Sequence, residues 1–144
     1  MYKKILIAVD LSETSPQVIK RAKQLADKIG AAMQLLHVVE YIPIESMEPM
    51  GDALLPSMDI HKDMISKAER ELDKLAKQYG LGDIPRLVSS GSIKGEIVRV
   101  AEEDGCDLVV LGSRERHGLS ILLNATDDTV LHKAKCDMLA VRLS

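Results

Sequence analysis

Five short apolar segments alternate along the chain with stretches whose apolar residues recur at helical spacing. Two of the segments, Ile5–Val9 and Leu108–Leu111, are apolar at every position. Such continuous runs are typical of strands buried on both faces of a parallel sheet that helices cover. Arg86–Ser90 is more polar, so we expect it at a sheet edge. The other two predicted strands are Met33–Val39 and Met138–Leu143.

The intervening stretches predict four helices. Ser15 and Pro16 indicate the start of the first, with Ser15 as N-cap and Pro16 at the first helical position, and Gly30 indicates its end. The other predicted helices cover Met64–Tyr79, Ile93–Ala101 and a stretch that Thr126 can cap.

The segment from Glu40 to Ser57 contains three prolines and a glycine, which predict a loop. Four methionines lie in or near it: Met47, Met50, Met58 and Met64. Because methionine adapts to irregular surfaces, the segment could form a lid or a partner contact. The plainer alternative is a loop that packs against the sheet edge.

The alternation of strands and helices predicts an α/β fold in one domain, residues 1–144. Right-handed crossovers then give a five-stranded parallel doubly wound sheet with strand order 3-2-1-4-5 and four helices. Ligands of such sheets bind beyond the carboxyl ends of the strands, where the strand order reverses. That point lies between Asp10 and Gly112, with Val39 nearby.

Composition and charge exclude several classes of protein. The 144 residues include 19 Lys and Arg against 22 Asp and Glu, a net charge of −3, which argues against nucleic acid as a partner. No apolar run approaches the roughly 20 residues of a membrane span, and we expect no signal peptide. Cys106 and Cys136 lie in no metal or redox spacing, so we expect reduced thiols and a cytoplasmic location.

Known catalytic and nucleotide-binding motifs are missing from the sequence. No G-x-G-x-x-G follows Ile5–Val9, and no Walker A sequence occurs. A receiver domain would need an aspartate where Ser89 or Ser90 stands. Ser12 has no histidine beside it in a known catalytic spacing, and the four histidines lack ligand spacing. We therefore expect neither a metal site nor an enzyme with its own catalytic centre.

Four segments resemble the universal stress protein family, in order and over essentially the whole chain. They are Lys3–Ser12, Leu36–Val39, Asp107–Ser113 and Met138–Val141. The resemblance implies an adenine nucleotide alpha hydrolase-like fold and a role in the stress response through protein partners that the sequence does not name. It also implies a homodimer through the last strand, at Met138, Leu139, Ala140 and Val141.

The ATP-binding branch of this family carries G-x-x-G, nine further residues, and then G-S or G-T. Gly112 and Thr126 match this motif, whereas Glu115 and Ala125 replace two of its glycines. The resemblance further implies adenine and ribose contacts at Asp10, Val39 and Gly112. The candidate nucleotide-binding residues are therefore Asp10, Ser12, Val39, Gly112, Arg114 and Thr126.

The replacements leave two hypotheses open. In the first, Glu115 and the acidic pair Asp127–Asp128 occupy the place of the phosphates and pair with Arg114 and Arg116, so ATP binds weakly or not at all. In the second, the arginines grip the phosphates, a magnesium ion bridges to the acids, and the protein is an ATP-binding nucleotide sensor. A turn role for Asp10 is an alternative to ligand contact.

Overall fold

The computed structural model describes residues 1–40, 54–113 and 135–143, without the side chains of residues 54–58. The predicted fourth helix, after Thr126, lies outside this part of the chain. The helices and strands of the described residues, in chain order, are β1 (Lys4–Ala8), α1 (Ser15–Ile29), β2 (Ala32–Glu40), α2 (Leu54–Gln78), β3 (Arg86–Gly91), α3 (Ile93–Glu103), β4 (Leu108–Gly112) and β5 (Asp137–Val141).

The five strands form one parallel sheet in the order β3-β2-β1-β4-β5, which confirms the predicted topology. Strand β1 lies at the centre, where Ile5 pairs with Met33 of β2 on one side and with Leu108 of β4 on the other. Strands β3 and β5 are the two edges, as expected from the polar sequence of β3 and from the topology.

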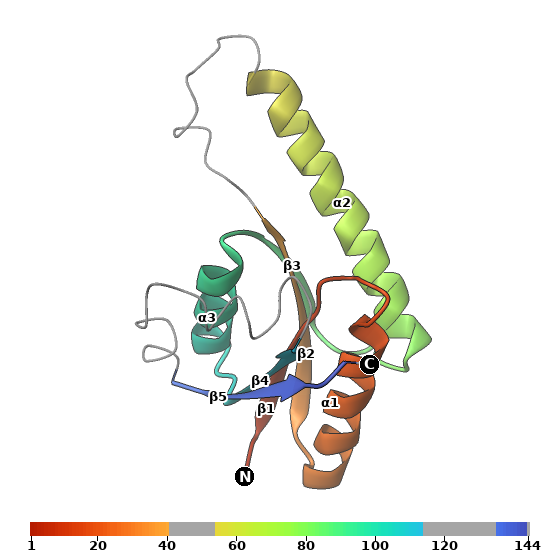
Figure 1. Cartoon of the computed structure of the whole chain (residues 1–144), viewed down its shortest axis with the longest axis vertical. Coiled ribbons are helices and arrows are strands. Elements are labelled where there is room, and N and C mark those ends of the chain that lie inside the picture. Colours follow the sequence, from red (N-terminus) through yellow and green to blue (C-terminus); the bar gives the residue numbers. More distant parts are fainter. Residues whose placement is uncertain (41–53, 114–134, 144) are drawn as a thin grey trace.

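Helices cover both faces of the sheet, α1 and α2 on one and α3 on the other (Figure 1). Because side chains alternate along a strand, Ile5 and Ile7 enter the apolar cluster under α1 and α2, and Leu6 enters the cluster under α3. All three are fully buried. This two-sided burial explains why the central strands carry uninterrupted apolar runs.

The start of α1 differs from the prediction by one residue. Thr14 is the N-cap and makes no side-chain capping bond, while Ser15 is already helical. The Ser15 hydroxyl is instead buried and donates to Asp10 Oδ1 at 3.2 Å. The Ser15 hydroxyl, which the sequence suggested as the cap, therefore bonds to the turn after β1 instead of capping α1.

The predicted loop from Glu40 to Ser57 was wrong at both ends. Glu40 is the last residue of β2, and α2 begins at Leu54, well before Met64. Pro56 is thus the third residue of a helix, in the first turn, where a missing N–H breaks no helical hydrogen bond. The remainder of the segment, and with it the role of its methionines, lies outside the described residues.

Asp107, just before β4, anchors the amino-terminal end of the chain. Its carboxylate accepts hydrogen bonds from the backbone N–H of Lys3 at 2.8 Å and of Lys4 at 3.0 Å. These two bonds favour the charged carboxylate and hold the pKa of Asp107 below its ordinary value. The start of β1 is thereby fixed next to the start of β4.

Asp107→Asn should lower the free energy of unfolding at pH 7 by about 1 kcal/mol, allowing for partial solvent exposure. A depressed folded-state pKa gives stability that is present above the unfolded pKa, near 4, and is lost as pH falls through the folded value. The deficit of the variant should therefore shrink below about pH 4. Urea titrations at pH 7 and at a series of acidic pH values measure it, with Asp83→Asn in an exposed turn as control. An equal deficit at every pH would contradict this role.

Candidate functional site

The site expected from the topology lies where the strand order reverses around β1. Ile7 pairs with Leu35 of β2 and with Val110 of β4, so the chain beyond β1 emerges between the carboxyl ends of both neighbours. Val9 continues the pairing, because its N–H donates to the Leu36 carbonyl oxygen at 3.0 Å. Asp10 is therefore the first residue to leave the sheet.

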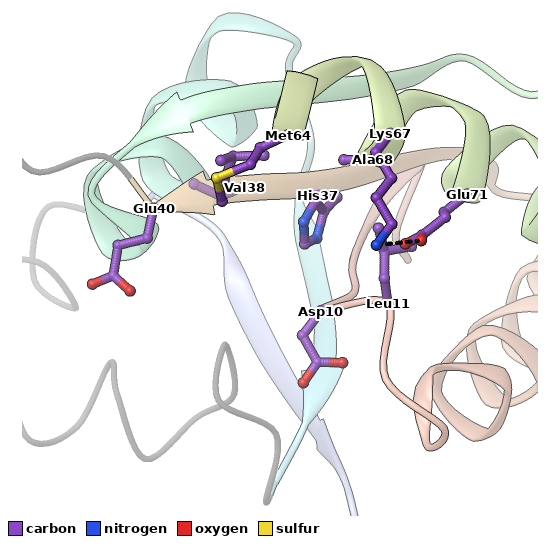
Figure 2. A pocket seen from close by; sticks show the side chains of 10 residues that line it. Asp10, Leu11, His37, Val38, Glu40, Met64, Lys67, Ala68 and Glu71 are labelled. Carbon is purple, nitrogen blue, oxygen red and sulfur yellow. Dashed lines mark ion pairs between the residues drawn. The ribbon is translucent and has the colours of Figure 1, made fainter. Parts of the chain in front are cut away.

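A cleft of about 650 Å³ opens at this point, between the carboxyl ends of β1 and β2 and the side of α2. Figure 2 shows Asp10 and His37 facing it from the sheet side, with Met64 and Lys67 on the helix across from them. The described residues that line the cleft are Asp10, Leu11, His37, Val38, Val39, Glu40, Met64, Lys67, Ala68 and Glu71.

Asp10 shapes the turn between β1 and α1. Its Oδ1 accepts from the backbone N–H of Ser12 at 2.9 Å as well as from the Ser15 hydroxyl. Leu11, between them, has φ of 62°, a left-handed conformation that is costly for a residue with a side chain. The Asp10 carboxylate bridges this strained residue, so the turn is held rigidly at the mouth of the cleft.

His37 joins the ends of β2 and β1. Its Nδ1 lies 2.8 Å from the carbonyl oxygen of Val9. Because a carbonyl oxygen can only accept, Nδ1 carries the hydrogen in this bond. The ring is buried, so His37 packs within the sheet.

Charged side chains on α2 were missed by the sequence analysis. Lys67 and Glu71 line the cleft from consecutive turns of the helix, with Lys67 Nζ 3.8 Å from Glu71 Oε1. The described lining thus holds three carboxylates, on Asp10, Glu40 and Glu71, and one ammonium group, on Lys67. The i,i+4 spacing of Lys67 and Glu71 was a usable signal, but the sequence did not place them beside Asp10.

The structure brings together only part of the predicted nucleotide site. Asp10 and Val39 line the cleft. Gly112 ends β4 at the same edge of the sheet but is buried and does not belong to the described lining. Ser12 is exposed and borders a smaller hollow beside Pro16. Arg114 and Thr126, with Glu115 and Ala125, lie outside the described residues, so ligand contact by any of these residues stays a prediction.

The described residues offer neither a preformed metal site nor a membrane-spanning helix. They contain no group of three or more histidine, cysteine or acidic side chains arranged to hold a metal ion. None of the helices described is both long enough and apolar enough to span a bilayer.

Known proteins of one family resemble this protein along nearly the whole chain. The model of the universal stress protein family matches residues 1–142. Universal stress protein A homolog 2 of Coxiella burnetii is 34% identical over 143 residues, covering 99% of this chain and 96% of that protein. Universal stress protein A homolog 1 of the same organism is 33% identical, covering 97% and 96% of the two chains.

Solved structures agree with these sequence relationships. The structure of MJ0577, a universal stress protein of Methanocaldococcus jannaschii, superposes with a TM-score of 0.73 at 28% identity, covering 99% of this chain and 96% of that chain. A universal stress protein crystallised in complex with cAMP superposes with a TM-score of 0.66 at 25% identity, covering 99% of both chains. On its sequence, its strand order and these relatives, the chain belongs to the universal stress protein family.

Proposed function

We propose that this protein is a cytoplasmic stress-response protein without a catalytic centre, which acts as a homodimer through partner proteins and binds ATP weakly or not at all. The charge of the cleft carries the proposal. The described lining of the cleft holds three carboxylates and one ammonium group. This excess of negative charge among the described lining residues disfavours an anionic phosphate tail.

The polar groups of the cleft support a structural role over catalysis. Asp10 Oδ1 accepts hydrogen bonds that form the β1–α1 turn, and His37 Nδ1 donates to the end of β1. Each bond fixes the framework at the strand ends. Cys106 and Cys136 are free thiols, which fits a reducing compartment.

The homodimer is supported by the chemistry of β5. This strand is a sheet edge, and its outer residues include Leu139, which is 37% exposed in the isolated chain. An apolar edge strand tends to pair with another chain unless something covers it. A two-fold axis beside β5 would cover two such edges at once, because each strand meets its own copy.

A second candidate function is nucleotide sensing in the same cleft. The cleft has the volume typical of small-molecule sites, and Val39 and Asp10 offer an apolar contact and a carboxylate that could accept from ribose hydroxyl groups. A structural relative was crystallised with cAMP. The described part of the cleft therefore offers contacts to the nucleoside part of a nucleotide rather than to its triphosphate.

Calorimetric titration with ATP and magnesium should show no saturable binding at micromolar concentrations. The gain-of-function variant Glu115→Gly/Ala125→Gly restores both glycines of the family motif and removes one carboxylate, so backbone N–H groups could approach the phosphates. It should bind at least about tenfold more tightly than the natural chain.

Micromolar affinity of the natural chain would overturn the first proposal and favour the sensor. Titration with adenosine measures the binding of the nucleoside part without the phosphates. Binding of adenosine but not of ATP would place the obstacle at the phosphates.

A further inference from the structure

The two cysteines, distant in sequence, meet at the opposite end of the sheet from the cleft. Cys106 lies in the turn between α3 and β4, and Cys136 directly precedes β5. Both contact the apolar cluster under α3. Both also line one cavity of about 330 Å³, whose other described residues are Ala101, Glu102, Gly105 and Lys135.

Strand pairing fixes how the two thiols approach each other. Leu108 of β4 pairs with Asp137 of β5, and the Asp137 N–H donates to the Asp107 carbonyl oxygen at 3.1 Å. Cys106 and Cys136 therefore each directly precede a member of this hydrogen-bonded pair, Cys106 before Asp107 and Cys136 before Asp137. Both side chains lie against the same apolar cluster and line the same cavity, the shared side that a disulfide between them requires.

We propose that Cys106 and Cys136 are a redox modification site, at which a hydroperoxide converts the two thiols into an intramolecular disulfide. Cys136 is half-buried and Cys106 is buried, so Cys136 reacts first. Its thiolate attacks a peroxide oxygen, the O–O bond breaks, and a sulfenic acid and water form. The Cys106 sulfur then attacks the Cys136 sulfur, the S–O bond breaks, and a second water leaves with the Cys106 proton. The two thiols supply the two electrons that reduce hydrogen peroxide.

The local environment makes this reaction slow at neutral pH. Burial raises the pKa of Cys106 to about 11, and it also raises the pKa of Cys136. Because the thiolate is the reactive form, both groups stay reduced until the oxidant is abundant or the pH is high. This behaviour suits a site that responds to severe oxidation rather than one that turns over peroxide continuously.

The test uses the full chain, exposed to excess hydrogen peroxide and analysed by intact mass and non-reducing peptide mapping. We expect a loss of two hydrogens, a peptide that links Cys106 to Cys136, and reversal of both by dithiothreitol. The initial rate should rise with pH, approaching about tenfold per unit, because the thiolate fraction does so below the thiol pKa.

The single variants Cys136→Ser and Cys106→Ser provide matched controls. Neither can form the link. In Cys106→Ser the remaining Cys136 thiol should accumulate as sulfinic acid, whereas in Cys136→Ser the buried Cys106 should oxidise more slowly. If Cys106→Ser fails to fold, peptide mapping of the natural chain still tests whether the disulfide forms. The proposal is overturned if both cysteines of the natural chain are recovered unmodified, if they oxidise separately, or if the disulfide joins two molecules.

Discussion

Leu36→Ala will lower the free energy of unfolding by about 3 kcal/mol. Leu36 lies in β2, is fully buried, and packs in the cluster under α3 with Leu6 and Ile97. Truncation removes the burial of its methyl groups and leaves a cavity that rigid neighbouring strands cannot close. Urea unfolding followed by circular dichroism measures the loss.

Leu87→Ala is the matched control, because Leu87 of β3 pairs with Leu36 in the sheet register. Both leucines lie in strands, but they differ in burial, because Leu87 is 38% exposed at the sheet edge. Its truncation should cost about 1 kcal/mol or less. Similar losses for the two variants would mean that the sheet edge is covered as fully as its centre.

Leu139→Lys should weaken the proposed homodimer by at least about a hundredfold. In a two-fold interface at β5, the substitution occurs once in each subunit, so it replaces an apolar contact and brings two ammonium groups together. Lysine on an edge strand is also a device by which proteins block edge-to-edge pairing. Sedimentation or light scattering over a concentration series should show a monomer where the natural chain is a dimer.

Leu87→Lys controls for the general effect of a lysine on an edge strand. Leu87 and Leu139 have nearly equal exposure, 38% and 37%, but lie on opposite edges of the sheet. The Leu87 variant should keep the mass of the natural protein. If it dissociates and the Leu139 variant does not, the dimer uses β3. A natural chain that is monomeric at micromolar concentration would remove the dimer from the proposed function.

The strand order could be predicted because the sequence encodes it through burial. Ile5–Val9 and Leu108–Leu111 have no polar face, so they had to be central, whereas Arg86 and Ser90 mark an edge. Asp10 and Val39 were placed correctly at the strand ends by the same reasoning. Their meeting in one cleft follows from parallel pairing, which fixes where neighbouring strands end.

Other features depend on contacts that local sequence does not express. Pro56 suggested a loop, yet proline is also compatible with the first turn of a helix, so residue type alone could not locate the start of α2. The i,i+4 spacing of Lys67 and Glu71 is typical of a solvent-exposed pair, and only the docking of α2 brings them to the cleft that Asp10 lines. Cys106 and Cys136 fit no spacing motif, because pairing of β4 with β5 is what brings them together.

The anchoring of the first residues by Asp107 bears on how the protein can be handled in the laboratory. The hydrogen bonds to the backbone begin at Lys3, while Met1 is 93% exposed. Leu143, at the other terminus, is buried in the cluster under α1 and α2. An affinity tag or fluorescent fusion therefore belongs on the amino terminus, where it can extend into solvent without displacing a core side chain next to β5.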